Sequence, residues 1–164
     1  MFLLAAYRGA GDTQTTTQTL LATISADGKV SVPGSVAIQV SGNRFSAMSG
    51  NVTLSYWART SSGGGGSVTV QANDFSPSGG PTAASVSYTC SGATLGTGCS
   101  GPQTLSTTTE SPVVSLPSNV CTGSGSGCSN QEPNTVLLSF SLPNLPHYKT
   151  GTYSAQLTFT MSTM

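Results

Sequence analysis

Charge is what this sequence has least of. Only 6% of its 164 residues are charged, and five basic residues balance five acidic ones. Nucleic-acid binding needs clustered Lys and Arg, and so does attachment to an anionic membrane surface. The composition therefore argues against both partners. Polarity comes instead from Ser and Thr, which make up roughly a third of the chain, well above average usage.

Groups for acid–base chemistry are equally scarce. The chain has one histidine, His147, and five scattered carboxylates: Asp12, Asp27, Asp74, Glu110 and Glu132. No G-x-S-x-G or comparable context surrounds a serine that His147 would activate. The glycines at 63–66 lack the Gly-Lys-Ser/Thr ending of a phosphate-binding loop. We therefore expect no enzyme, no cofactor and no metal, with a triad or a pair of glycosidase carboxylates as minor alternatives.

Helical periodicity is absent as well. No window of useful length repeats apolar residues at a helical spacing, and Gly and Pro recur throughout. Apolar and polar residues instead alternate with period two, and Val and Thr are abundant. The alternating segments are 20–32, 35–40, 51–58, 67–72, 85–90, 112–117, 135–142 and 151–164. This pattern predicts an all-β protein, an antiparallel β-sandwich of Ig-like or pilin-like type with about seven to nine strands.

Turn signals refine this expectation. Asp27-Gly28 lies between alternating runs, which predicts a β-hairpin that begins the sandwich. We therefore divide the chain into an N-terminal extension, 1–19, and a β-sandwich domain, 20–164. The glycines at 63–66 are expected at a hairpin tip. The segment 112–117 is bounded by prolines, which suits an edge strand.

The final segment, "GTYSAQLTFTMSTM", alternates most regularly of all. It predicts a strand whose buried face carries Tyr153, Leu157 and Phe159 and whose other face is wet. We expect that face to pack on the core residues Leu138, Phe140, Val68 and Val70, so that Leu157→Asp would prevent folding. A strand also needs neighbours on both edges, and the sequence does not show what pairs with this one.

The four cysteines form two close pairs. Cys90 and Cys99 enclose one Gly/Ser-rich loop, and Cys121 and Cys128 enclose another. Zinc ligands are usually two to four residues apart, so these wider spacings favour disulfides. Four cysteines allow three pairings, and the short loops favour the local one. Disulfides indicate an oxidising location such as the cell surface or the medium.

The N-terminus begins with the short apolar run "MFLLAAY". It is too short to span a membrane, and it has neither a basic flank nor a convincing small-residue cleavage site. It is either the remnant of a signal peptide or part of the mature chain.

Trp57 and Arg59 lie on the face of their segment opposite Leu54 and Tyr56. They are therefore expected to point away from the core. An exposed Trp can stack on a sugar ring, so these residues form a candidate ligand surface. The alternative is that Trp57 packs against the second sheet or a neighbouring subunit.

Three features resemble secreted bacterial β-sandwich subunits of surface filaments, including the spore-coat-protein-U type. They are the closing "GTYSAQLTFTMST", the segment "GGSVTVQANDFSPSGGP" and the two cysteine loops. The resemblance implies a pilin-like fold, secretion and self-assembly. One departure is that no cysteine precedes Cys90, whereas many pilus subunits have an early one.

The leading hypothesis is therefore a structural subunit of an extracellular filament, pilus or surface fibre. The N-terminal extension would enter a groove of a neighbouring copy as an added strand and make a head-to-tail homopolymer. The donated side chains would be those of Phe2, Leu3, Leu4, Tyr7 and Leu20. The alternative is a carbohydrate-binding or adhesive module that uses Trp57, with polysaccharide or a cell surface as its partner. A viral shell or decoration protein is a third interpretation.

Overall fold

The structure, a computed structural model, describes residues 19–40, 42, 45–121, 127–129 and 131–164. This part of the chain contains ten strands and one short 3-10 helix. They are β1 (Asp27–Ser31), β2 (Gln39–Val40), β3 (Met48–Arg59), β4 (Gly66–Ala72), η1 (Ala83–Ser85), β5 (Ser87–Ser91), β6 (Thr97–Gly98), β7 (Gln103–Thr104), β8 (Ser111–Leu116), β9 (Asn134–Leu142) and β10 (Leu157–Thr163). The strands pair antiparallel throughout. The prediction of an all-β, antiparallel fold is confirmed.

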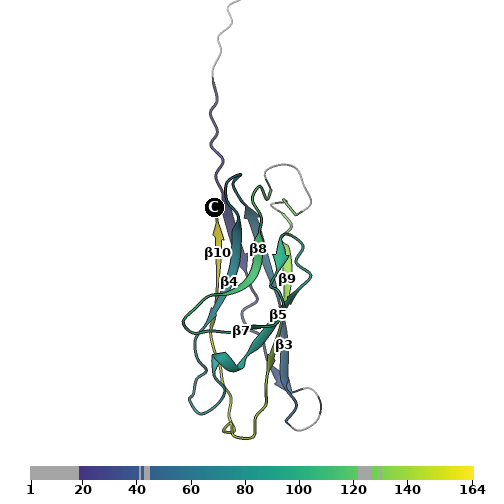
Figure 1. The fold of residues 1–164 in the computed structure, drawn as a ribbon, viewed down its shortest axis with the longest axis vertical. Coiled ribbons are helices and arrows are strands. Elements are labelled where there is room, and N and C mark those ends of the chain that lie inside the picture. Colours follow the sequence, from purple (N-terminus) through teal and green to yellow (C-terminus); the bar gives the residue numbers. More distant parts are fainter. Residues whose placement is uncertain (1–18, 41, 43–44, 122–126, 130) are drawn as a thin grey trace, which may run out of the picture.

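The strands form two sheets that face each other (Figure 1). The six-stranded sheet has the order β1-β3-β9-β5-β7, and β2 pairs with β3 beside β1. The four-stranded sheet has the order β10-β4-β8-β6. Consecutive strands therefore often belong to different sheets. The alternation of the sequence shows which side chains of a strand point to the core, but it does not show which strands pair.

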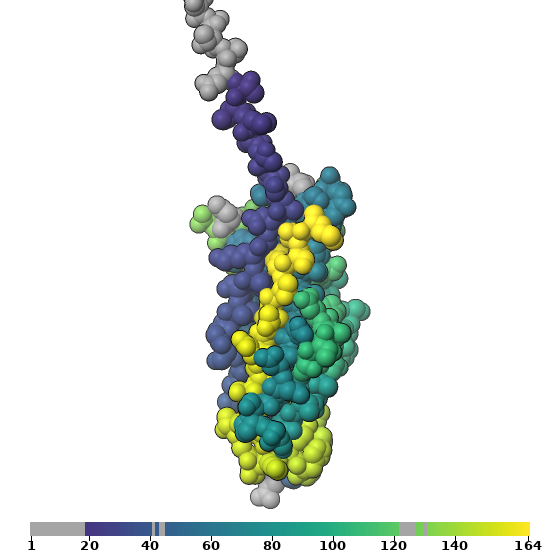
Figure 2. All heavy atoms as spheres, turned by 90° about the vertical axis from the view of Figure 1, so that its left-hand side faces the viewer, coloured from purple at the N-terminus to yellow at the C-terminus, as the bar shows by residue number. Residues whose placement is uncertain are grey.

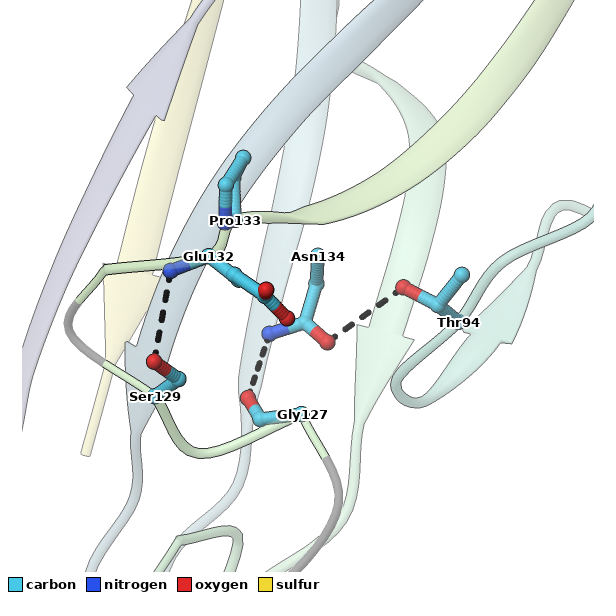
Figure 3. A pocket seen from close by; sticks show the side chains of 6 residues that line it. All are labelled: Thr94, Gly127, Ser129, Glu132, Pro133 and Asn134. Atoms are coloured by element: carbon cyan, nitrogen blue, oxygen red, sulfur yellow. Dashed lines mark hydrogen bonds between the residues drawn. The ribbon is translucent and has the colours of Figure 1, made fainter.

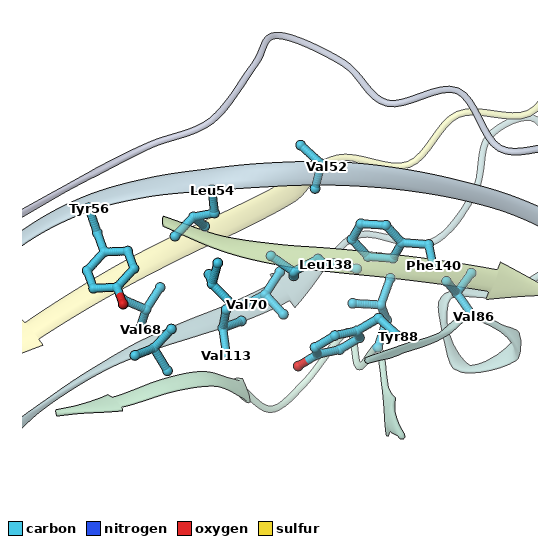
Figure 4. Packing of buried hydrophobic residues seen from close by; sticks show 14 of the residues in the cluster. Val52, Leu54, Tyr56, Val68, Val70, Val86, Tyr88, Val113, Leu138 and Phe140 are labelled. Carbon is cyan, nitrogen blue, oxygen red and sulfur yellow. The ribbon is translucent and has the colours of Figure 1, made fainter. Parts of the chain in front are cut away.

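One hydrophobic core fills the space between the sheets (Figure 4). Inward positions of β3 and β9 are buried in strict alternation, as the period-two pattern predicts. Opposite them lie the inward residues of β4 and β8, including the fully buried Val68, Val70 and Val113. The alternating segments 51–58, 67–72, 85–90 and 135–142 thus correspond to real strands, and their apolar faces meet in the core.

The Cys90–Cys99 and Cys121–Cys128 disulfides are both present, so the local pairing predicted from the sequence is confirmed. Cys90 lies on β5 of the six-stranded sheet. Cys99 follows β6 of the four-stranded sheet, and its N–H donates to Val113 O at 3.0 Å. The first disulfide therefore ties the two sheets together at one side of the molecule, and a loop of this size is stabilised by about 2–3 kcal/mol.

The predicted hairpin at Asp27-Gly28 is wrong. Both residues belong to β1, which pairs with the far end of β3, Asp27 opposite Arg59. The side-chain register gives the reason. A two-residue turn at this point would set Ser25 opposite Val30, on the face that packs against the core, and would turn Ile24 outward. Pairing β1 with β3 keeps Val30 inward without burying Ser25.

Three smaller expectations also differ. The loop that carries Gly63–Gly66 is not a hairpin tip, because β3 and β4 belong to different sheets. A Cβ on Gly65 would lie 2.5 Å from Leu116 O, so this crossing needs glycine. The 112–117 segment is β8, which is flanked by β4 and β6 rather than lying at an edge. In 35–40 only Gln39–Val40 is strand.

Two buried tyrosines anchor their hydroxyl groups on main-chain carbonyls. Tyr56 OH donates to Leu95 O, and Tyr88 OH donates to Pro112 O at 2.7 Å. Burial raises the pKa of Tyr88 to about 12, and it also raises the pKa of Tyr56. Both side chains are therefore held as neutral phenols inside the core.

This arrangement predicts a specific loss of stability in alkali. The unfolded chain loses the Tyr88 proton near its ordinary pKa of 10.0, but the folded chain loses it only near 12. The stability that the neutral phenol contributes is therefore complete below pH 10 and is lost as the pH rises towards 12. Denaturant unfolding across this range, with tyrosinate absorbance as the probe, measures the loss.

Tyr88→Phe is the matched control. It should cost about 1 kcal/mol at neutral pH, because Pro112 O loses its donor. It should also remove part of the alkaline decline. An unchanged pH dependence in this variant would show that Tyr88 is not the group responsible.

Candidate functional site

The two sheets end side by side at β1 and β10, opposite the side that the Cys90–Cys99 disulfide closes. β1 is an end strand of the six-stranded sheet, and β10 is an end strand of the four-stranded sheet. Figure 2 shows them next to each other along the molecule. They pack directly, since a Cβ on Gly28 would lie 2.9 Å from Met161 Cγ. Among the described residues no ladder of hydrogen bonds joins them, so this side is open only in the sense that no backbone pairing closes it.

The hydrogen bonds that flank β10 show which of its backbone groups are unused. Asn73 N donates to Gln156 O, and Met164 N donates to Gly65 O, each at 2.9 Å. In an antiparallel ladder every second residue bonds to the same neighbour. The even-numbered residues therefore bond to β4. The N–H and C=O groups of Leu157, Phe159, Met161 and Thr163 point to the unpaired edge.

The inner face of β10 is only half-buried, which corrects the prediction that this face is buried and its other face wet. Leu157, Phe159 and Met161 are partly exposed, whereas their neighbours across the ladder, Ala72, Val70 and Val68, are buried. Tyr153, which precedes β10, is partly exposed as well. The reason is the missing neighbour. A side chain on an end strand is covered on one side only, because no further strand lies beyond it. The result is a half-exposed apolar strip of Leu157, Phe159 and Met161 with an unpaired backbone edge along it, bordered by β1 at Gly28; the term groove is used for this strip and its edge.

An extended segment projects from the same side of the molecule. Residues 19–26 belong to no strand and rise past the end of the body (Figure 1). Leu20 is 95% exposed, Leu21 87% and Ile24 75%. The expected boundary at 19/20 thus falls within the projecting segment, and the folded body begins at β1. Of the predicted donor residues, Phe2, Leu3, Leu4 and Tyr7 lie outside the described residues.

Arg59 holds the base of this segment. Its Nε donates to Ser25 O at 2.7 Å, where the segment leaves β1. This bond uses a residue that the sequence placed on a ligand surface, and it directs the segment away from the body. Sequence reasoning missed this role because it depends on the pairing of β1 with β3, which sets Arg59 opposite Asp27 and was not predicted.

Trp57 is half-buried on the outer face of the six-stranded sheet. Lys29 Nζ lies over its ring, 5.2 Å from the centroid, in a cation–π contact. Trp57 Nε1 is enclosed and has no hydrogen-bond partner in the described part of the chain. One ring face is therefore already in contact with Lys29, which leaves less of the ring for a sugar than the sequence indicates.

A pocket of about 220 Å³ lies beside the second disulfide, lined by Thr94, Gly127, Ser129, Glu132, Pro133 and Asn134 (Figure 3). Its buried amide forms a hydrogen bond at each end. Asn134 Nδ2 donates to Gly127 O at 2.6 Å, and Asn134 Oδ1 accepts from the Thr94 hydroxyl at 3.3 Å. These bonds secure the loop against β9. The lining offers one carboxylate and no second titratable group, so it does not assemble acid–base machinery.

Comparison with models of known protein families finds no match, and comparison with curated proteins finds no significant match either. Within the part of the chain that the structure describes, no helix is long and apolar enough to cross a bilayer. The two disulfides are consistent with a secreted protein. The functional interpretation is based on the unpaired edge of β10 and on the projecting segment.

The half-buried groove makes a prediction that separates it from the core. Leu157→Asp should cost about 1–2 kcal/mol and leave the protein folded, because the new carboxylate reaches water. Val70→Asp, on β4 opposite Phe159, should prevent folding, because its carboxylate would be enclosed. Denaturant unfolding with the disulfides intact measures both. Equal, complete loss of folding would mean that the chain itself covers the groove.

Proposed function

We propose that the protein is a secreted structural subunit that polymerises head to tail by β-strand donation into an extracellular filament or surface fibre. In this proposal the fold is an Ig-like or pilin-like sandwich that lacks one strand on its open side. The N-terminal extension of one copy, continued by the projecting segment 19–26, supplies this strand to the next copy. The observation that carries the proposal is the groove along β10, where unpaired backbone groups and half-buried apolar side chains coincide.

The groove has the two requirements of β-strand addition. The outward backbone groups of Leu157, Phe159 and Met161 supply hydrogen bonds, and their inward side chains supply an apolar floor. An incoming strand with alternating apolar residues would satisfy both at once. Each buried aliphatic side chain would contribute about 1.5–3 kcal/mol.

The projecting segment has a matching pattern. Leu20, Ala22 and Ile24 share one face of an extended chain, and Leu21, Thr23 and Ser25 share the other. The first face is the better donor face, since its three side chains are all apolar. Exposed aliphatic side chains on an extended segment gain free energy when a partner surface covers them, and the groove offers such a cover.

The segment cannot place this face in the groove of its own copy by folding back through a tight turn. The two-residue turn at Asp27-Gly28 would bring Ser25 and Thr23, not Ile24, onto the inner face. The groove of another copy imposes no such register. This difference favours exchange between copies over closure within one copy.

The direction of the chain determines the form of the assembly. β10 runs toward the end of the body from which the segment projects, and the segment runs back toward the body (Figure 1). A copy stacked above in the same orientation would therefore receive the segment antiparallel to its β10. Such a joint uses different surfaces of the two partners, so it does not close and its repetition gives a filament.

The experiment compares two neighbouring substitutions on opposite faces of the donor. Ile24→Asp should abolish polymerisation, because a carboxylate would enter the apolar groove without a partner. Thr23→Asp introduces the same charge one residue away on the other face and should still polymerise. Negative-stain microscopy and sedimentation of purified protein provide the readout.

Neither substitution lies in the folded body, so both variants should unfold at the same denaturant concentration as the parent monomer. Filaments of Ile24→Asp equal to those of Thr23→Asp would refute donation through this face. Absence of polymers in the parent protein under native conditions would refute the structural function itself.

A further inference from the structure

We infer that the Cys121–Cys128 disulfide controls the groove: when oxidised it holds the end of β10 in place, and its reduction releases that end. The two are linked by a set of main-chain contacts, called here the clasp. The inference rests on the proposed function, because it concerns the control of the same strand addition. The clasp consists of Thr60, Ser61, the segment 117–121 and Met164.

The clasp lies at the end of the body from which the projecting segment leaves. β10 ends there, next to the C-terminus, and so does β3, which Thr60 and Ser61 continue toward β4 (Figure 1). Ser61 N donates to Met164 O at 2.8 Å. This bond joins the chain that follows β3, a strand of the six-stranded sheet, to the end of β10, a strand of the four-stranded sheet. It therefore fixes the end of the groove strand relative to the other sheet.

The chain that follows β8 supports the same bond from the other side. Thr60 N donates to Val120 O at 3.1 Å, and Asn119 N donates to Ser61 O at 3.0 Å. Three stretches of chain are thus joined in a row, with Ser61 between Asn119 and Met164. Displacing the stretch that follows β8 would remove the support of the residue that holds Met164.

A buried hydroxyl group secures this stretch. Thr60 is 1% exposed, and its Oγ1 accepts from Val120 N at 2.8 Å and donates to Pro117 O at 2.9 Å. Val120 is buried as well. One enclosed hydroxyl thus links two main-chain groups, and losing it would leave the buried N–H of Val120 without a partner.

The backbone on either side of Val120 shows why the disulfide matters for the clasp. Asn119 and Cys121 both have left-handed backbones, with φ of 60° and 58°. Asparagine tolerates this conformation, but other side chains rarely adopt it, and it persists only where the surrounding structure imposes it. At Cys121 the bond to Cys128 supplies this constraint. Opening the bond would let Cys121 return to a commoner conformation and would displace Val120 with it.

A dithiol opens the bond by a balanced exchange. One thiolate of the reagent attacks a cysteine sulfur, and the other cysteine leaves as a thiolate and takes up a proton. The second thiol of the reagent then displaces the first cysteine as the reagent closes into its own disulfide, so that two electrons pass to the protein. The reverse exchange, with an oxidised dithiol, re-forms the bond. Assembly would therefore begin only after the chain reaches an oxidising compartment.

Residue-resolved amide exchange of the unassembled protein tests the clasp. Cys121→Ser/Cys128→Ser removes this disulfide and leaves the other intact. The N–H groups of Ser61 and Met164 should then exchange at least about fivefold faster than in the parent, the effect of roughly one lost hydrogen bond. The N–H of Thr160, in the middle of the ladder between β10 and β4, should exchange as before.

Two substitutions at Thr60 test the clasp with both disulfides in place. Thr60→Val keeps the shape of the side chain and removes the hydroxyl, so it should also speed exchange at Ser61. Thr60→Ser keeps the hydroxyl and should behave as the parent.

Sedimentation of polymers tests the control of assembly. At equal concentration, Cys121→Ser/Cys128→Ser should yield less polymer than the parent, because the end of its groove strand is no longer fixed.

The outcomes separate this inference from strand donation. Unchanged exchange at Ser61 and Met164 would overturn the clasp, and so would an equal rise at Thr160, which would show a general loss of stability. Faster exchange with undiminished polymer would overturn the control of assembly. Failure of the parent to polymerise would overturn strand donation and its control, while the exchange rates would still decide whether the disulfide holds β10.

Discussion

A β-strand has two edges, and β10 uses only one of them. Its even-numbered residues bond to β4, while the backbone groups of Leu157, Phe159 and Met161 point to an edge that carries no strand. The same absence leaves their side chains half-buried, because the missing strand would also have covered the groove. Backbone pairing and apolar burial are therefore incomplete at one place, and one added strand would complete both.

The rest of the body is fastened away from this edge. On the opposite side, the Cys90–Cys99 disulfide joins the sheets, and the core tyrosines donate their hydroxyls to Leu95 O, between β5 and β6, and to Pro112 O on β8. At β1 and β10 the sheets touch through side chains, and among the described residues no backbone ladder between them covers Leu157 and Phe159. Arg59 adds the complementary feature, since its bond to Ser25 O directs the donor segment away from its own groove.

The period-two pattern predicted the all-β class and the facing of β3, β4, β5 and β9, because alternation alone determines which side chains can share a core. Short loops predicted the disulfide pairs. The pattern did not predict which strands pair, since the same alternation suits an end strand and a central one. The inner face of β10 was therefore expected to be as buried as that of a central strand. Asp27-Gly28 was misleading because the turn that it favours would place Ser25 beside Val30 on the face toward the core. Pairing with β3 keeps Val30 against the core, and this burial outweighs the local preference for a turn.

The most direct test of the account is amide hydrogen exchange in β10, residue by residue, in monomer and polymer. In the monomer, Thr158 and Thr160 should exchange slowly because they bond to β4, while Phe159 and Met161 should exchange quickly from the unpaired edge. Assembly should slow Phe159 and Met161 to the rates of their neighbours, since the donated strand accepts their N–H groups. Fast exchange at Phe159 and Met161 in the polymer would contradict strand donation along β10.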